Sequence, residues 1–437
     1  MSLLLRRTTP DALPTRGQGA VDAATLASAA LIVDDVRNNG EPALRAWAEK
    51  LGDLQPDARM VFDKAALKAA YDALPEADQA LLMRTAARVR VFAQAQRASL
   101  RDAVVQIPGG QAGHTVAPVE RAGCYAPGGR FPLPSSVLMT AVTARTAGVD
   151  EVWVASPRPV PMTLAAAHAA GADALLAVGG AQAIAALAYG AGVVPACDVV
   201  VGPGNRWVTA AKKLVAGDVG IDMLAGPSEL VVLADATADA SVIAADLLAQ
   251  AEHDPDAVPV LVTTDAALAD RVDIALAAQL ETLPTAATAR AALQNGCAVI
   301  APDLVSAIEA CNRLAPEHLE VMVADPWSVT PRLRHYGGLF VGALAAEVLG
   351  DYGAGPNHVL PTGRTARHVG GLSVLTFLRV RTWLEVTSRD AAHDIVSDAV
   401  ALARHEGLEA HARAAEKRLV ATPDSHANAA KRLPSNS

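Results

Sequence analysis

A glutamate and a histidine stand side by side at Glu317 and His318, in the segment APEHLE. An imidazole has an ordinary pKa of about 6.5, so it exchanges protons near neutral pH, and an adjacent carboxylate can serve a second proton. The pair is therefore a candidate for acid–base catalysis. A structural alternative is open, in which Glu317 is an acid of a first helical turn and His318 is its exposed neighbour.

A second candidate pair, Gln250 and His253, lies in the segment LLAQAEHD at residues 247–254. A spacing of three residues places both side chains on one face of a helix, from which both can reach a single metal ion. The alternative is a solvated helix end, where a histidine interacts favourably with the helix dipole.

The segment GDYGAGPNHVLP at residues 350–361 surrounds an acid, an amide and an imidazole with glycines and prolines. Such a loop is costly to order unless it positions something. We therefore expect Asp351 to be a metal ligand and His358 to contact a substrate, and a purely structural loop is the alternative.

Glycine-rich turns follow two short apolar segments, with GGAQ ending at Gln182 and GPGN ending at Asn205. Free backbone N–H groups at the start of a helix can bind the pyrophosphate of a dinucleotide such as NAD. The G-x-G-x-x-G pattern is absent, so plain tight turns are the alternative. Tyr125 could lie on a flat cofactor ring, or it could be a core tyrosine.

The elements that position these residues predict an α/β fold. Residues 26–100 have a helical pattern, and from about residue 122 short apolar segments alternate with alanine-rich helical ones, which is typical of βαβ units around parallel sheets. The chain becomes helical and polar after about residue 373. The predicted strands are 151–155, 175–178, 199–201, 230–234, 258–263, 298–301, 319–323 and 338–341, and the later helices are 239–252, 267–281 and 304–314.

Composition excludes several classes of protein. The 437 residues carry a formal net charge of −9 with no long basic run, so we expect no nucleic-acid partner. The uncharged segment 174–197 contains several glycines and Pro195, which argues against a membrane span. The four cysteines have no CxxC spacing, so we expect neither disulfides nor a thiolate zinc site, and we expect a cytoplasmic protein.

Taken together, the motifs resemble those of the histidinol dehydrogenase family along nearly the whole chain. Leu224 stands where proline is expected, and Arg206 and Trp207 vary in a way that the family tolerates. The matching segments are CYAPGGRFPLPSSVLMTAV from Cys124, VGGAQAIAALAYG from Val178, VGPGNRWVTAAK from Val201, IDMLAGPSELVVLAD from Ile221, DLLAQAEHDPDA from Asp246, APEHLE from Ala315, GDYGAGPNHVLPT from Gly350 and EGLEAHARA from Glu406.

This resemblance implies a homodimer with shared active sites that oxidises L-histidinol to L-histidine through L-histidinal, the last step of histidine biosynthesis. His318 would be the general base of both hydride transfers, and Glu317 would activate water for the second. By the same resemblance, zinc is bound by Gln250, His253, Asp351 and, from the partner subunit, His411. NAD contacts Tyr125, Gln182 and Asn205, and the substrate contacts are Ser228, Gln250, His253, His318, Asp351 and His358, with Glu406 and His411 from the partner subunit.

The resemblance also implies two Rossmann-like domains with parallel sheets, one inserted in the other. The predicted division is an N-terminal tail at 1–23, a main domain at 24–124 and 231–372, an NAD-binding domain at 125–230, and a helical tail at 373–437 that contacts the partner subunit.

Three other functions could use some of the same residues. A zinc and NAD dehydrogenase of a sulfonated diol would keep the fold, but a sulfonate favours a basic residue where this chain has Glu406, which suits a cationic amino alcohol. A zinc hydrolase would not need the two glycine-rich turns. A non-catalytic metal scaffold would leave Glu317 and His318 without a role.

Overall fold

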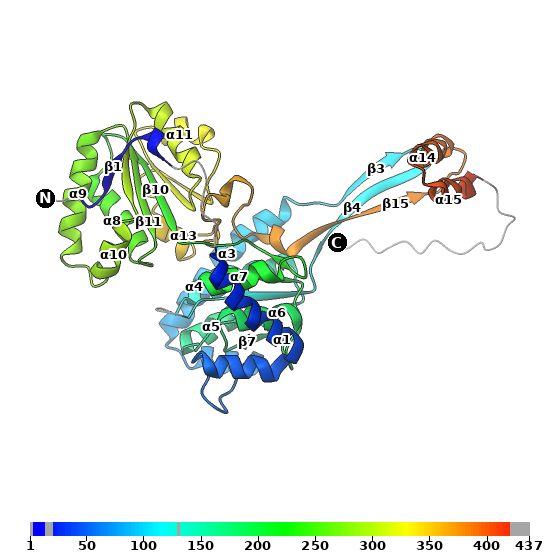
Figure 1. Ribbon diagram of the computed structural model, residues 1–437, viewed down its shortest axis with the longest axis horizontal. Helices are drawn as coiled ribbons and strands as arrows, with labels where there is room; N and C mark the ends of the chain where they lie inside the picture. Colours follow the sequence, from blue (N-terminus) through cyan, green and yellow to red (C-terminus); the bar gives the residue numbers. More distant parts are fainter. Residues whose placement is uncertain (1–2, 14–20, 129–131, 420–437) are drawn as a thin grey trace. The chain divides into compact units, whose positions relative to one another are not determined.

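The computed structural model describes residues 3–13, 21–128 and 132–419. The chain divides into two compact units (Figure 1). Unit 1 comprises Met1–Ser99 and Pro118–Leu378, and unit 2 comprises Leu100–Ala117 and Arg379–Ser437. Unit 1 contains two six-stranded sheets, and unit 2 contains most of a three-stranded sheet.

The first six-stranded sheet, sheet A, is parallel throughout. Helices α8 (Ala240–Ala251), α9 (Ala266–Leu280) and α10 (Ala286–Leu293) share a core with Leu230 and Val232, whereas α11 (Leu304–Leu314) shares one with Val231 and Leu233. Because alternate residues of a strand point to opposite faces, both faces of the sheet are buried. In spatial order the strands are β1 (Arg6–Thr8), β12 (Cys297–Ile300), β11 (Val258–Thr263), β10 (Glu229–Ala234), β13 (His318–Met322) and β14 (Gly338–Val341).

The second six-stranded sheet, sheet B, is parallel except for its edge strand β2, which pairs antiparallel with β7. Its strands, in spatial order, are β2 (Val61–Asp63), β7 (Ala174–Leu176), β6 (Glu151–Ala155), β5 (Arg121–Tyr125), β8 (Val199–Val201) and β9 (Gly220–Ile221). Two groups of helices cover it. One comprises α1 (Ala23–Lys50), α6 (Gly180–Tyr189) and α7 (Arg206–Val215), and the other comprises α2 (Lys64–Asp72), α3 (Glu76–Ala98), α4 (Pro134–Ala147) and α5 (Pro161–Ala170).

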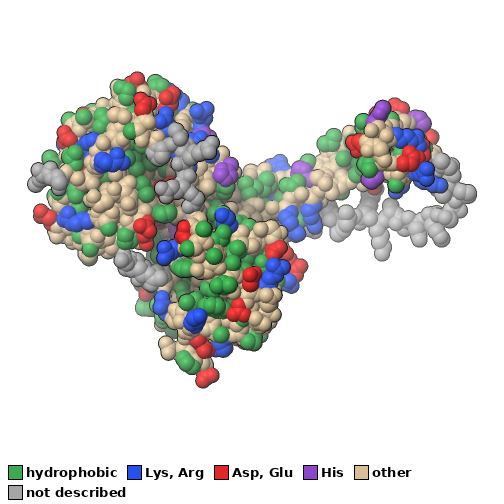
Figure 2. Space-filling model, in the orientation of Figure 1, with side chains coloured by type: hydrophobic (Ala, Val, Ile, Leu, Met, Phe, Trp, Pro, Cys, Tyr) green, Lys and Arg blue, Asp and Glu red, His purple; other side chains and the backbone are tan. Residues whose placement is uncertain are grey.

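Unit 2 is small and buries few apolar side chains. It consists of β15 (Leu378–Val386), β4 (Gly110–Pro118), β3 (Ala103–Ile107), α14 (His393–His405) and α15 (Glu409–Leu419). Ala392, Val400 and Ala412 are buried in it, whereas Val380 and Leu384 are exposed. Figure 2 shows charged side chains gathered on its two helices, where Arg404 pairs with Glu409 and Glu416.

Short helices complete unit 1. They are α12 (Pro326–Val329), α13 (Glu347–Asp351) and the 3-10 turns η1 (Pro10–Ala12), η2 (Thr330–Arg332), η3 (Thr365–Arg367) and η4 (Val374–Phe377). No helix among the described residues is long and apolar enough to cross a membrane.

The predicted α/β class with two parallel-sheet domains is confirmed, and the segment that forms sheet B lies between β1 and β10 of sheet A. The arrangement differs from the predicted division in two places. Helices α1, α2 and α3 pack with the helices of sheet B, although residues 24–124 were grouped with 231–372. Part of the predicted tail 1–23 contributes β1 to sheet A. The reason is that an amphipathic pattern shows which face of an element is buried, but not against which sheet.

The predicted boundaries of the domain 125–230 and of the tail 373–437 stay predictions, and residues 1–2, 14–20 and 420–437 of the predicted tails lie outside the described residues.

The two large sheets share one winding order. In sheet A the chain runs from β10 outward through β11 and β12, then returns to add β13 and β14 on the other side of β10. In sheet B it runs from β5 through β6 and β7, then adds β8 and β9 on the other side of β5. Each sheet therefore has a switch point, between β10 and β13 and between β5 and β8, and ligands commonly bind open α/β sheets at such points.

An acid precedes the returning strand in both sheets. Glu317 accepts a hydrogen bond from the backbone N–H of Glu229, the first residue of β10, at 3.0 Å. Asp198 accepts one from the backbone N–H of Arg121, the first residue of β5, at 2.9 Å. At the amino ends of both sheets, a carboxylate thus links the central strand to its neighbour.

Candidate active site

The acid–base pair lies at the amino end of β13. Helix α11 ends at Leu314, where Ala315 adopts a left-handed conformation with φ 46° and Pro316 prevents the helix from continuing. The chain then enters sheet A with Glu317 and His318, which are 7% and 4% exposed. The helix ending therefore fixes where both side chains enter the protein interior.

Glu317 is held by two donors at a single oxygen. Its Oε2 accepts hydrogen bonds from Ser228 Oγ at 2.5 Å and from Glu229 N at 3.0 Å. Burial raises the pKa of Glu317 to about 7, although these hydrogen bonds oppose the shift. A carboxyl group that titrates near neutrality can take a proton from water, which is the chemistry predicted for it.

His318 has one occupied and one free ring nitrogen. Nδ1 lies 3.1 Å from the backbone oxygen of Glu229, and because a carbonyl can only accept, Nδ1 carries the proton. Nε2 therefore bears the lone pair, and this atom is buried without a hydrogen-bond partner. Burial also lowers the pKa of His318 to about 4, so the imidazole is neutral over the physiological range. The ring is thus prepared to accept a proton at Nε2.

Three of the predicted metal ligands lie close together. Gln250, in the last turn of α8, is fully buried, and both polar atoms of its amide lack a partner. His253 Nδ1 lies 2.9 Å from the carbonyl oxygen of Ala249, so Nε2 is the nitrogen that could bind a metal. That Nε2 is 3.7 Å from Oδ2 of Asp351, the last residue of α13.

The charges around this group suit a divalent cation. A hydrogen bond from His253 to the carboxylate of Asp351 raises the pKa of His253 to about 9. Burial opposes ionisation of Asp351, but the hydrogen bond with His253 and the charge of His358 outweigh it and lower its pKa. Without a metal, the imidazolium of His253 pairs with the carboxylate of Asp351, and the amide of Gln250 has no partner. Zinc would take the place of the proton on His253. The residues therefore fit zinc.

The other predicted ligand, His411, and the predicted substrate contact Glu406 lie in unit 2, where both are exposed. Among the residues that the structure describes, no group of three or more His, Cys, Asp or Glu side chains is arranged to hold a metal ion. Of the three predicted ligands in unit 1, only His253 and Asp351 belong to these residue types, because Gln250 would bind a metal through its amide.

The loop that carries Asp351 and His358 is anchored to α4. His358 Nδ1 lies 3.0 Å from the backbone oxygen of Asp351, and its Nε2 lies 3.2 Å from Ser136 Oγ. Asn357 donates from Nδ2 to the backbone oxygen of Met139 at 2.8 Å. The glycine-rich loop is thus ordered by polar contacts with a helix of sheet B.

The predicted NAD contacts surround the switch point of sheet B, at the carboxyl ends of its strands. Tyr125 ends β5, and its hydroxyl accepts a hydrogen bond from the backbone N–H of Gly180 at 3.3 Å. Asn205 caps α7 by accepting from two backbone N–H groups of its first turn. A Cβ at Gly202 would lie 2.0 Å from the backbone oxygen of Tyr125, so only glycine fits this turn. The geometry matches the place where open α/β sheets bind dinucleotides.

Several acids of unit 1, half-buried or buried, were not predicted. Asp53 Oδ2 accepts from Gln182 Nε2 and from Gly179 N, both at 2.9 Å, so it orders the turn before α6. Asp246, Glu320 and Glu347 lie buried near His318. A charged residue inside an otherwise apolar strand, such as Glu320 in HLEVM, is a signal that could have revealed them.

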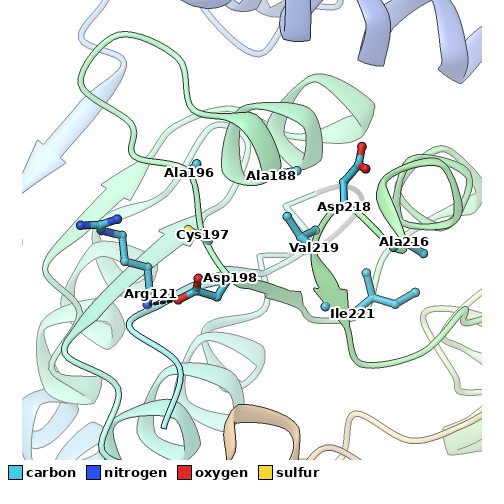
Figure 3. Close-up of a pocket in the computed structure, with 11 residues that line it drawn as sticks. Arg121, Ala188, Ala196, Cys197, Asp198, Ala216, Asp218, Val219 and Ile221 are labelled. Atoms are coloured by element: carbon cyan, nitrogen blue, oxygen red, sulfur yellow. Dashed lines mark hydrogen bonds between the residues drawn. The ribbon is translucent and has the colours of Figure 1, made fainter. Parts of the chain in front are cut away.

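An open pocket of about 760 Å³ lies at the opposite, amino end of sheet B. Figure 3 shows Arg121 and Asp198 on its wall, with Val219 and Ile221 across from them. None of the predicted site residues lines it.

A parallel-sheet fold, a buried acid–base pair and a glycine-rich turn at a switch point together define the class as an α/β enzyme with proton-transfer chemistry. Comparison with known proteins gives the family. The profile of the histidinol dehydrogenase family matches residues 16–419. The chain belongs to this family, and it is therefore an oxidoreductase.

Individual relatives agree. The chain is 47% identical over 389 residues to the histidinol dehydrogenase of Thermus thermophilus, covering 89% of this chain and 93% of that protein. It is 45% identical over 393 residues to that of Halobacterium salinarum, covering 89% and 91%. The crystal structure of histidinol dehydrogenase from Elizabethkingia anophelis superposes with a TM-score of 0.87 at 29% identity, over 96% of this chain and 99% of that one. None of these relatives supports the sulfonated-diol alternative.

Proposed function

We propose that this protein oxidises L-histidinol to L-histidine, through L-histidinal, with two molecules of NAD. The observation that carries the proposal is the unpartnered Nε2 of His318, a neutral base one residue from a carboxyl group that titrates near neutrality. Membership of the histidinol dehydrogenase family supports it.

The two residues divide the proton transfers. His318 Nε2 takes the hydroxyl proton of the alcohol while a hydride leaves the same carbon. Glu317 then takes a proton from water, so that the oxygen adds to the aldehyde, and His318 accepts the hydroxyl proton of the hydrate in the second oxidation. Ser228 donates to Glu317 and orients its carboxyl group.

NAD bound at Tyr125, Gln182 and Asn205 would supply the hydride acceptor. The turn after β8, at the switch point of sheet B, supports this site. The turn after β7 also supports it, because the backbone N–H of Gly180 donates to the hydroxyl of Tyr125, the last residue of β5.

Zinc would be held by Gln250, His253, Asp351 and, from the partner subunit, His411, and it would supply a Lewis acid that anchors the nitrogen atoms of the substrate. The unpartnered amide of Gln250 and the pairing of His253 Nε2 with Asp351 support the assignment. These ligands, with Ser228, His318, His358 and Glu406 of the partner subunit, would form the substrate site.

We infer a homodimer because unit 2 leaves large apolar side chains exposed, among them Val105, Val380, Leu384 and Leu402. Such a surface suits burial against a second copy, and a dimer would let Glu406 and His411 complete the partner's site. We also infer a cytoplasmic location, which the four buried, unpaired cysteines support.

The test of the function is the amount of NADH formed per L-histidinol consumed, before and after chelation. Two NADH per substrate, lost on chelation and restored by zinc, are expected. A metal-loaded protein that makes no NADH from L-histidinol would overturn the proposal.

The shared site has its own test. Glu317→Gln and His411→Ala should each abolish the oxidation of L-histidinal to L-histidine in the homodimer, because each removes one part of every site. After subunit exchange, half of the dimers are mixed and each mixed dimer has one intact site, so about a quarter of the wild-type rate of L-histidine formation should return. No recovery, despite proven exchange, would mean that each site is built from a single chain.

A further inference from the structure

Three buried carboxyl groups lie behind His318, on the side of sheet A that carries α8. Glu320 is two residues after His318 in β13, so both side chains project from the same face of the sheet. Glu347 donates its backbone N–H to Glu320 Oε1 at 2.8 Å, and its own Oε2 lies 3.8 Å from His318 Nδ1. Asp246, on α8, forms a side-chain hydrogen bond with Glu320. Glu347 therefore meets Glu320 through its backbone N–H, and the side chain of Glu320 continues to Asp246 on α8.

Among the described residues, no lysine or arginine forms an ion pair with any of these three buried groups. Glu320 is 1% exposed and Glu347 is 2% exposed, while Asp246 keeps 9% and is the closest of the three to solvent. As carboxylates, both side-chain oxygens of Glu347 and one oxygen each of Glu320 and Asp246 would accept no hydrogen bond. A proton held between Glu320 and Asp246 supplies one of the missing donors.

The charges that face Glu347 favour its protonated form. Burial raises its pKa well above the ordinary value, and the acids Asp351, Glu320, Glu317 and Asp246 raise it further. The imidazole of His318, the other titratable group beside it, is neutral at rest. Burial raises the pKa of Glu320 and Asp246 as well. A buried cluster of this kind costs stability, and such costs concentrate at functional sites.

The chemistry of the proposed function creates a need for this cluster. When His318 accepts the alcohol proton it becomes an imidazolium, and at 4% exposure water cannot stabilise that charge. The backbone oxygen of Glu229 at Nδ1 supplies only a dipole. A negative charge that forms beside Nδ1 at that moment would stabilise the imidazolium.

We propose that Glu347 is a positioning residue for His318 that releases its own proton through Glu320 and Asp246 when His318 accepts one, and so becomes the counter-ion of the imidazolium. This inference rests on the proposed function. The O–H bond of the alcohol breaks as the N–H bond at Nε2 forms, and the O–H bond of Glu347 breaks as its proton moves to Glu320. The proton of Glu320 moves to Asp246, and one proton leaves Asp246 for water. Only protons move, so no oxidant or reductant beyond NAD is involved.

Glu347→Gln tests the proposal with three readouts in the zinc-loaded enzyme. Without a counter-ion the base is weaker, so kcat/KM for L-histidinol should fall about tenfold or more, with KM within about twofold. The acid limb of the kcat/KM profile should shift to lower pH, because the imidazolium is no longer stabilised. A loss of packing alone would not move that limb.

Proton release is the third readout. With one NAD per site, only the first oxidation occurs, and an indicator dye reports protons in the solvent while absorbance reports NADH. In the wild type both signals should rise together. In Glu347→Gln the proton should lag behind NADH, because it stays on His318.

Asp246→Asn gives an independent test at a less buried position, and it should show the same lag. Glu309→Gln, the same kind of change at an exposed acid of α11, should match the wild type. Prompt proton release and an unshifted acid limb in both Glu347→Gln and Asp246→Asn would overturn the inference. If Glu347→Gln does not fold, prompt proton release in Asp246→Asn alone would overturn the inference. A wild type that makes no NADH from L-histidinol would refute the proposed function instead.

Discussion

Replacing Glu317 by glutamine should separate the two oxidations. Glutamine keeps an oxygen that can accept from Ser228 Oγ and Glu229 N, which lie 2.5 and 3.0 Å from the present carboxylate, so the contact between the strands is retained. An amide cannot take a proton from water. Removing a general base slows its step by about 10²–10⁴-fold, or about 3–5 kcal/mol. The alcohol step, whose base is His318, should slow less than about tenfold.

The assay is stopped-flow absorbance of NADH with L-histidinol and, separately, with L-histidinal. The variant should form the first NADH at nearly the wild-type rate and the second far more slowly, so that enzyme-held aldehyde accumulates. L-histidinal as the starting substrate should show the whole defect. Equal slowing of both steps would refute the division of labour between Glu317 and His318.

Asp198→Asn is the matched control. It makes the same acid-to-amide change at the equivalent position of sheet B, where Asp198 accepts from Arg121 N at 2.9 Å. Any loss of folding stability that comes from the strand contact should therefore occur in both variants. The slow second oxidation should occur only in Glu317→Gln.

Three further predictions concern the base, the metal site and the acid cluster. His318→Asn should slow both oxidations by about 10²-fold or more, because each needs the same base; one unaffected step in the NADH traces would contradict this. Gln250→Leu removes two buried polar atoms that lack partners, so the free energy of unfolding of the zinc-free protein should rise by about 1–3 kcal/mol and its melting temperature should increase. Zinc should no longer raise the melting temperature of this variant. Equal zinc-dependent shifts in variant and wild type would exclude Gln250 as a ligand. Glu320 has a raised pKa in the folded state, so its contribution to stability is fully present below its ordinary pKa of 4.5 and is lost as the pH rises through the raised value. Urea unfolding should therefore show Glu320→Gln gaining stability relative to the wild type as the pH increases, and a difference independent of pH would argue against a buried proton at this position.

The sequence was most informative where local pattern determines structure. Each of the eight predicted strands corresponds to one of the strands β6, β7, β8, β10, β11, β12, β13 and β14, and the helix 304–314 coincides with α11. Buried parallel strands are continuous apolar segments between turn residues, so composition alone marks them. The strands β1, β2 and β9 were not predicted, because they have two or three residues and lie at sheet edges. The central strand β5 was not predicted either, because its sequence RAGCY, with an arginine and a glycine, is not a continuous apolar segment.

Unit 2 shows the opposite case. Residues 103–118 form a hairpin, and Leu378–Val386 forms a strand in a segment predicted to be helical. Seven of the nine residues of that strand are exposed, which removes the alternation of buried and exposed side chains from which a strand is recognised. Its position in the fold depends on pairing with residues more than 250 positions earlier, such as Gln111 with Glu385.

The site divides in the same way. Spacing predicted Gln250 and His253 on one helix, but only Gln250 lies on α8, which ends at Ala251, and His253 lies in the turn that follows. Adjacency placed Glu317 beside His318. Periodicity could not bring Asp351 to His253, because that contact joins the ends of two separate helices. Nor could it show which nitrogen of His318 is free, because that depends on the backbone oxygen of Glu229 across the sheet.

The paired acids at the amino ends of the two sheets bear on what can change at this site. Asp198 shows that a carboxylate at this position is useful for architecture alone, since it links neighbouring strands far from any predicted chemistry. Glu317 makes the same link with one oxygen, which leaves the other for a reaction. A substitution that preserves only the chemistry weakens the sheet, and one that preserves only the link abolishes the second oxidation. Glu317 thus has two independent roles, the link between the strands and the activation of water. An aspartate at this position would have to fill both roles with a side chain that is one methylene group shorter.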